Sequence, residues 1–419
     1  MISRLRKMSI NMARWRHGLC AIALSSLSLG VGSAHAEDSL GAALTGGKVS
    51  LDLRYRFEHV GEDNANKDAA ASTLRTALGY TTGTFDNFGA LVEFENISVI
   101  GPERYNSTIN GLTRYSKVAD PKGSEVNQAY LSFSGLSATV MQLGRQRITL
   151  DNQRFIGKSG SRQNEQTFDG FELVNKSIAD TQVTYAYLTD AHRSTGPDAS
   201  NGNLHMKSHI INAGYRGLGF GTLTGYAYLL DIDNQALLGT ASASAKTLGL
   251  RFTGTHGLTD STALLYTAEY AKQSNYADNP HRYELPYLLG ELGATISGVT
   301  AKFGYENLGS DGTYSVQVPI GTRHSRDGWD DMFSPATPAK GLVDQSLSVA
   351  ATLAGIDANA AYHDFTADKG GAKYGTERDF ITSRTWEKKY TLGLKYAAYH
   401  ADTFGVGTNK AWVWGEVKF

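Results

Sequence analysis

The feature that most constrains this sequence is an alternation of apolar and polar residues with a period of two. It is clearest at residues 49–58, where apolar Val49, Leu51, Leu53, Tyr55 and Phe57 alternate with Ser50, Asp52, Arg54, Arg56 and Glu58. Such alternation is typical of a β-strand whose two faces meet different surroundings. The pattern recurs at residues 73–80, 264–271, 390–397 and 411–419, and no stretch repeats like a long amphipathic helix. We therefore predict an all-β protein.

Short and long connections take turns between these strands. The short ones lie at residues 83–88, 134–137, 217–219, 257–260 and 297–298, and the long ones at 101–123, 149–164, 190–207, 274–285 and 308–341. All eight prolines fall in the long connections or at their edges, where no strand hydrogen bond is lost. This asymmetry predicts a transmembrane antiparallel β-barrel of about 18 strands, with short periplasmic turns and long extracellular loops. An even strand number requires residues 373–386 to form a strand.

A secreted β-sandwich or β-helix is the alternative fold for an alternating sequence. It would not predict the asymmetry of the connections or the terminal aromatic Phe419. Tyrosines also gather near the ends of the alternating segments, as they do in the aromatic girdles of membrane barrels. The pattern therefore favours a barrel in the outer membrane of a Gram-negative cell, which the chain crosses many times.

The first residues have the composition of an export signal. Basic residues from Arg4 to Arg16 precede an apolar run at 19–31, and Ala34–His35–Ala36 follows as a small-x-small cleavage pattern. We predict a signal peptide at 1–36, cleaved after Ala36, and a barrel channel at 37–419. The alternative, a membrane anchor, needs a longer run than these roughly 13 residues. Cleavage of the signal peptide removes five basic residues and takes the net charge of the chain from −1 to −6, which argues against nucleic-acid binding.

The most distinctive charges lie between residues 143 and 171. This stretch carries Arg145, Arg147, Arg154 and Arg162, interleaved with Asp151, Glu165 and Asp169. It begins in one predicted strand and ends in the next, so we expect it to fold into the lumen. Arginines there would favour anions, and paired acids would hold the arginines in place. The alternative is a salt-bridge network that only pins an inward loop; both can hold together. Strand alternation from 139 to 143 puts Arg145 on the outer face unless a bulge intervenes or the strand has already left the bilayer.

Other predicted pore-lining residues lie on the polar side of strands, namely Arg54, Arg56, Arg75, Glu93 and Glu95, with Glu58, Glu172, Glu269, Lys302, Glu306 and Lys395 on the same side of theirs. Residues 327–331 (DGWDD), in the longest loop, are predicted to form a solvated surface turn. We predict no metal site and no cofactor. A lipase or protease inside a barrel is an alternative, but the sequence has no G-x-S-x-G or H-E-x-x-H motif.

Several of these segments resemble the alginate-export family of outer-membrane proteins. The resemblance lies in GRQR at 144–147, DNQRF at 151–155, RQNEQTFD at 162–169, YTLGLKYA at 390–397 and ADTF at 401–404. It implies a barrel of 18 strands, and in the alginate exporter itself an arginine-rich constriction passes a polyanionic polysaccharide.

The expected function is a porin through which small anionic solutes, either organic acids or uronate-type sugars, pass passively. Two alternatives stay open: a dedicated exporter of an anionic polysaccharide such as alginate, and a plugged structural or adhesive surface barrel. The expected partners are outer-membrane lipid and lipopolysaccharide, the solutes, and the barrel-assembly machinery, which would read the last strand ending in Phe419.

Overall fold

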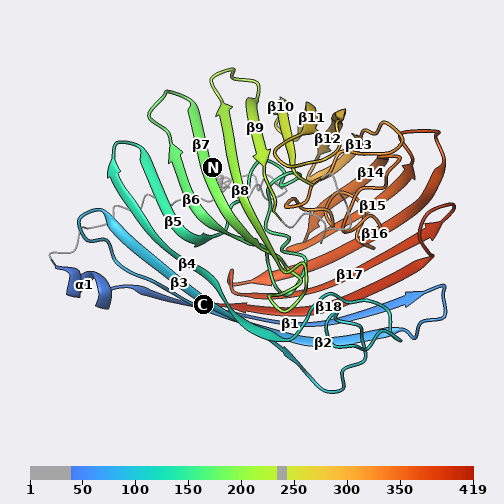
Figure 1. Cartoon of the computed structure of the whole chain (residues 1–419), viewed down its shortest axis with the longest axis horizontal. Helices are drawn as coiled ribbons and strands as arrows, with labels where there is room; N and C mark the ends of the chain where they lie inside the picture. The colour runs from blue at the N-terminus through green and yellow to red at the C-terminus, as the bar shows by residue number, and fades with distance from the viewer. Residues whose placement is uncertain (1–38, 234–242) are drawn as a thin grey trace, which may run out of the picture.

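A computed structural model describes residues 39–233 and 243–419, which form one short helix and eighteen strands (Figure 1). The helix α1 is Leu40–Thr45, and the first nine strands are β1 (Lys48–Glu62), β2 (Ala69–Thr81), β3 (Phe88–Val99), β4 (Gly123–Leu136), β5 (Thr139–Gln146), β6 (Thr167–Asn175), β7 (Thr181–His192), β8 (Asn203–Tyr215) and β9 (Thr222–Leu230). The predicted signal peptide and its cleavage site lie outside the described residues.

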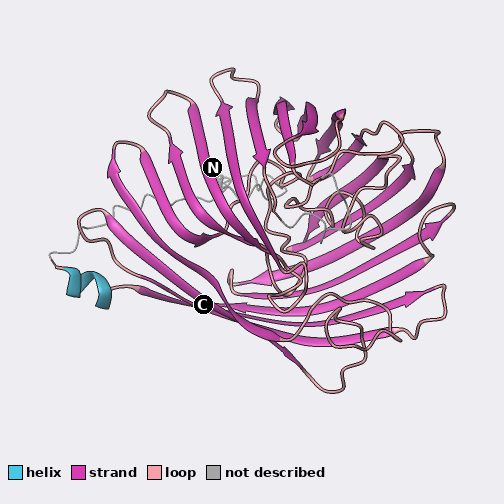
Figure 2. Cartoon of the chain, viewed as in Figure 1, coloured by secondary structure: helices cyan, strands magenta, loops and turns pink. Residues whose placement is uncertain are grey.

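The second half of the chain continues in the same way (Figure 2). Its strands are β10 (Ala245–Thr259), β11 (Thr262–Asn275), β12 (Glu284–Ile296), β13 (Val299–Leu308), β14 (Leu342–Leu353), β15 (Ile356–Thr366), β16 (Lys373–Trp386), β17 (Tyr390–Ala401) and β18 (Thr408–Lys418). The strand at 373–386, which was predicted because a barrel needs an even number of strands, is therefore present as β16.

The sheet closes on itself. Each strand pairs antiparallel with its neighbour in sequence, and β1 also pairs with β18, from Asp52 opposite Lys418 to Glu62 opposite Thr408. A closed sheet leaves no unpaired edge, which is the condition for a β-structure to span lipid. The predicted all-β fold, the antiparallel barrel and the number of strands are all confirmed.

The two faces of the wall differ as the alternation predicted. On β17, Leu392 and Leu394 are exposed on the outer face, while Lys395 and Ala397 alternate with them on the inner face. On β1 the inner face carries Arg56 and Glu58, and both side chains are buried inside the barrel. Outer-face tyrosines are also exposed, among them Tyr55, Tyr270, Tyr305, Tyr390 and Tyr396. Apolar side chains thus meet lipid, and charged ones meet the lumen.

The connections alternate in length around the barrel. Those of one end are short, such as 137–138 between β4 and β5 and 354–355 between β14 and β15, whereas those of the other end reach 100–122 and 309–341. β7 and β8 extend further than predicted, so their connection is 193–202. In the described part of the chain, no helix has the length and apolarity to cross a membrane.

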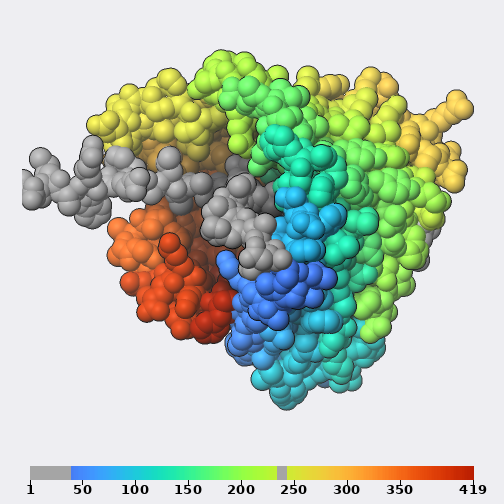
Figure 3. Space-filling view, turned by 90° about the vertical axis from the view of Figure 1, so that its left-hand side faces the viewer, coloured from blue at the N-terminus to red at the C-terminus, as the bar shows by residue number. Residues whose placement is uncertain are grey.

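The apolar core lies inside the barrel, where long connections fold back against the wall. Ile148 and Ile156 of the β5–β6 loop (residues 147–166) and Val318 and Ile320 of the β13–β14 loop (residues 309–341) belong to one buried cluster with inward wall residues. Figure 3 looks onto the left-hand end of Figure 1. The middle of that end is hollowed, with orange and red C-terminal strands on one side and blue and green strands on the other.

Two facing glycines mark the place where β5 and β6 give way to the β5–β6 loop. Gly144 and Gly170 are cross-strand partners, and both have positive φ, at 127° and 158°. A Cβ on Gly144 would lie 2.3 Å from the carbonyl oxygen of Ala129, and one on Gly170 would lie 2.1 Å from that of Tyr187. Only glycine fits this backbone without a shift, so these residues set the geometry from which the loop enters the lumen.

Candidate functional site

The β5–β6 loop folds into the lumen, as its sequence predicted. Phe155 at its tip packs edge-on against Tyr287 of β12, with ring centroids 5.0 Å apart, and also contacts the stacked pair Tyr226 and Tyr228 of β9. Asp151 is fixed nearby, because its carboxylate accepts hydrogen bonds from Asn212 Nδ2 (2.7 Å) and Tyr228 Oη (3.3 Å). Burial raises the pKa of Asp151. Asp151 therefore anchors the loop to the wall.

The β13–β14 loop folds into the same space and interlocks with the β5–β6 loop. The guanidinium of Arg154 donates two hydrogen bonds to Asp327, of 2.7 and 3.1 Å, and its Nε lies 3.0 Å from Glu306 of β13. Arg162 pairs with Asp331 and with Glu58 of β1. The backbones also join, with Thr322 N donating to Gln153 O (2.8 Å). The two loops form one unit that crosses the lumen.

Residues 327–331 are therefore not the solvated surface turn predicted from their polarity. Asp327 and Asp330 are only 1% and 3% exposed, and Trp329 covers the ammonium group of Lys395, whose Nζ lies 4.4 Å from its ring centre. Burial alone would raise the pKa of Asp331, but His324, Lys410 and Arg162 hold this pKa well below its usual range. The prediction was wrong because the charges that neutralise these acids come from distant parts of the chain.

The arginines of β1 and β2 line the inner face, and Arg54 and Arg56 of β1 hold the β5–β6 loop. Arg54 Nε donates to Gln163 Oε1 (2.9 Å), and Arg56 pairs with Glu58 (3.2 Å) and with Asp120 of the β3–β4 loop. Arg75 pairs with Asp52 and with Glu95 of β3. Burial would raise the pKa of Asp120, but Arg56 and Arg162 lower it. Arg54 and Arg56 thus join the wall to the loop, whereas Arg75 and Glu95 form an ion pair within the wall.

Arg147 of the predicted set pairs with two acids that are less exposed than itself. It pairs with Glu93 of β3 (2.6 Å) and with Glu165, and Asn127 donates to both acids at 2.7 Å. The side chain of Arg147 is 27% exposed, against 13% for Glu93 and 9% for Glu165. The side chain of Arg147 is thus more accessible to water than either of its acid partners.

Arg145 and Asp169 occupy the opposite face of the wall from the rest of the set. They are cross-strand partners two residues beyond Leu143 and Phe171, which share the outer face. Arg145 Nε lies 2.8 Å from Asp169 Oδ1, and His192 Nε2 lies 2.9 Å from Asp169 Oδ2. No bulge on β5 turns Arg145 inward; the chain changes face only after β5 ends at Gln146. This register removes Arg145 and Asp169 from the lumen-lining set.

A second cluster with exposed cations inside the barrel contains one residue that the sequence predicted, Lys302, and one that it did not, Arg326. Lys302 of β13 lies 2.6 Å from Glu291 of β12, and Arg326 of the β13–β14 loop lies 3.6 Å from the same carboxylate oxygen. Lys302 and Arg326 are 24% and 19% exposed, against 12% for Glu291. One acid thus faces two cations. Strand alternation indicated Lys302, but no sequence signal connected Arg326 with it.

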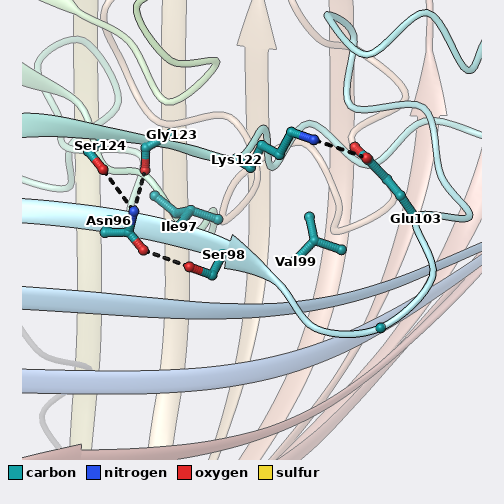
Figure 4. Close-up of a pocket in the computed structure, with 9 residues that line it drawn as sticks. Asn96, Ile97, Ser98, Val99, Glu103, Lys122, Gly123 and Ser124 are labelled. Atoms are coloured by element: carbon teal, nitrogen blue, oxygen red, sulfur yellow. Dashed lines mark hydrogen bonds and ion pairs between the residues drawn. The ribbon is translucent and has the colours of Figure 1, made fainter.

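A separate recess lies at the loop-bearing rim, where β3 and β4 diverge (Figure 4). Its volume is about 510 Å³, and Asn96 Nδ2 bridges its two sides by donating to Ser124 Oγ (2.8 Å) and to Gly123 O (3.2 Å). The exposed pair Lys122 and Glu103, 3.5 Å apart, closes its upper edge. Its polar groups satisfy one another, and it shares no residue with the lumen network.

Comparisons with known proteins agree with this architecture. A family model described as alginate export matches residues 47–302. Acinetobacter baumannii OccAB2 has a similar structure, with a TM-score of 0.72 and 15% identity over 90% of this chain and 99% of that chain. The Pseudomonas aeruginosa outer membrane protein OpdK gives a TM-score of 0.71 at 15% identity, over 90% and 99%.

A structure of OpdK with vanillate gives a TM-score of 0.70 at 14% identity, again over 90% of this chain and 99% of that chain. None of the curated proteins matches the chain. At these identities the similarity to the solved structures establishes the shared barrel fold.

Proposed function

Because this chain belongs to the alginate export family, and because its lumen presents cations, we propose that it is an outer-membrane channel selective for small organic anions. The solutes would be organic acids or uronate-type sugars that diffuse down their gradients, with no bond made or broken. The observation that carries this proposal is the difference in exposure within the ion clusters of the lumen: the side chain of Arg147 is two to three times as exposed as those of its acid partners, and that of Lys302 is twice as exposed as that of Glu291.

Such an arrangement favours weak and reversible binding of an anion. Paired carboxylates keep the guanidinium and ammonium groups in fixed positions and reduce their net charge. A passing carboxylate is then attracted strongly enough to enter the constriction and loosely enough to leave it. Arg147 and the pair Lys302 and Arg326 would supply two such positions, and Arg54 and Arg56 would hold the loop that shapes the constriction.

The solute class is also supported by the structural neighbour that was solved with vanillate, an aromatic carboxylate. The alternative that the family description favours is export of a polyanionic polysaccharide. The loop unit fixed across the lumen favours small solutes, because a polymer needs a continuous passage that is not crossed by buried ion pairs.

The test is single-channel recording of the purified protein in a planar bilayer under a salt gradient. We expect a reversal potential of the sign that anion selectivity produces. We also expect a concentration-dependent block of the current by vanillate and glucuronate, with no block by glucose. Block by oligomeric uronates but not by the monomers would favour the exporter. A barrel with no steady conductance, or one selective for cations, would contradict the proposal.

A further inference from the structure

The short helix α1 presents an apolar face that nothing in the barrel covers. Leu40 and Leu44 are 56% and 52% exposed, while Ala43 is 2% exposed against the barrel. Positions four apart lie on one side of a helix, so the two leucines form a single surface. No charged residue occurs between Ser39, which caps the helix by accepting a hydrogen bond from Ala42 N, and Gly47.

The contacts of α1 place it at the end of the barrel with the short turns, on the outer side of the wall. Gly83, in the turn between β2 and β3, donates its N–H to Ala43 O (2.9 Å). The hydroxyl of Tyr80 donates to Leu44 O and accepts from Gly47 N (3.2 Å). Tyr80 lies two residues beyond Leu78 and shares the outer face of β2 with it, so its hydroxyl holds the helix on the side that faces lipid.

This position makes the leucine face continuous with the lipid-facing band. Val49, the cross-strand partner of Tyr80, is 68% exposed; Leu78 and Phe88 on the neighbouring strands are 49% and 54% exposed. In Figure 1 the helix projects beyond the ends of β2 and β3, beside the turn that joins them. An apolar helix face at the edge of a membrane band fits the boundary between lipid headgroups and acyl chains.

We propose that α1 is an interfacial anchor that lies in the phospholipid leaflet on the periplasmic side of the outer membrane. Leu40 and Leu44 enter the acyl region, and Tyr80 holds the backbone of the helix to the barrel. The anchor concerns contact with lipid and not the passage of solutes, so a test of the anchor can fail without affecting the channel proposal.

Site-directed spin labelling tests this anchor, because the only cysteine of the chain is Cys20. In a Cys20→Ser background, single nitroxide labels are attached at Leu40→Cys, Leu44→Cys and Thr45→Cys. Each full-length variant is purified from outer membranes and reconstituted in vesicles of phosphatidylethanolamine and phosphatidylglycerol. Thr45 is the matched control, since it lies about 100° around the helix from Leu44. Leu78→Cys and Asn64→Cys report the lipid-facing wall and an aqueous loop, and heat-modified gel mobility confirms folding.

Accessibility to oxygen, which concentrates in lipid, is compared with accessibility to a water-soluble nickel chelate. We expect the ratio at Leu40→Cys and Leu44→Cys to approach that of Leu78→Cys, and the ratio at Thr45→Cys to shift toward that of Asn64→Cys. Equal nickel accessibility at all three helix positions would place α1 in water and overturn the proposal. Low accessibility to both reagents at the leucines would also overturn it, because another protein surface would then cover them.

Discussion

Arg154 and Asp327 stand 173 positions apart in the chain and meet in a bidentate ion pair inside the barrel. Neither is more than 1% exposed. Arg154 belongs to the loop that the sequence predicted to enter the lumen, and Asp327 to a loop that it did not. This pair joins the two loops into one unit, together with the pair of Arg162 and Asp331 and the backbone hydrogen bond from Thr322 to Gln153.

Removal of the Arg154 charge should therefore loosen the constriction. Arg154→Met leaves Glu306 buried without its paired cation and leaves Asp327 with Arg323 alone, at 3.5 Å, which should lower the free energy of unfolding by about 3–5 kcal/mol. Urea titration of folded barrel in vesicles measures this loss. Lys122→Met is the control, because its pair with Glu103 is exposed and should be worth about 1 kcal/mol or less. Equal effects of the two variants would show that the loop pair carries no special stability.

Arg147 and Arg145 provide a comparison between the two faces of one strand end. Arg147→Gln should shift the reversal potential toward cations, whereas Arg145→Gln on the outer face should leave it unchanged. A unit charge about 4 Å from a passing ion is worth about 1 kcal/mol in water, so the permeability ratio should change by up to about fivefold. Bilayer recordings under a salt gradient measure both variants. A shift with Arg145→Gln, or none with Arg147→Gln, would reverse our assignment of the faces.

The strands and their faces could be predicted because alternation is local and lipid enforces it along every strand. The same rule indicated Arg54, Arg56, Arg75, Glu93 and Glu95 on the polar side, where they lie. Alternation also indicated the outer face for Arg145, whereas the hypothesis of an arginine constriction placed this residue in the lumen.

What sequence could not provide is the packing of the long loops. Residues 327–331 contain three acids, and such a run in a long loop normally lies in water. Their burial depends on Arg154, Arg162 and Lys410, which only the closed barrel brings to them. Similarly, Arg326 joins Lys302 only because the β13–β14 loop turns inward.

Lys302 and Arg326 should form the second position for anions in the lumen. The double variant Lys302→Gln, Arg326→Gln should weaken block by vanillate more than either single variant, because Glu291 would then repel the solute without a cation beside it. Lys272→Gln is a matched control, since Lys272 also lies 2.6 Å from a glutamate, Glu284, but on the outer face. The blocking constant measured from current against vanillate concentration reports each effect. An unchanged constant in the double variant would exclude this pair from the solute path.

The docking of the β13–β14 loop should weaken as the pH rises, because of Asp330. Burial, together with the negative charge of Glu377, raises the pKa of Asp330 from 3.8 to about 8. Around it, Glu377 and Asp379 project from β16 and Lys410 from β18, and its backbone N–H donates to Glu377 Oε1 (2.8 Å). The docked loop therefore retains a proton that the undocked loop loses above about pH 4.

The sign of the effect follows from this difference in bound protons. Between about pH 4 and pH 8 docking loses stability as the pH rises, and above pH 8 both forms have lost the proton, so the dependence ends. Single-channel records should show more frequent loop fluctuations at pH 8 than at pH 5. Asp330→Asn should flatten this dependence, whereas Asp331→Asn should keep it, because the pKa of Asp331 is held below its usual range. A full pH dependence in Asp330→Asn would show that another group senses the proton.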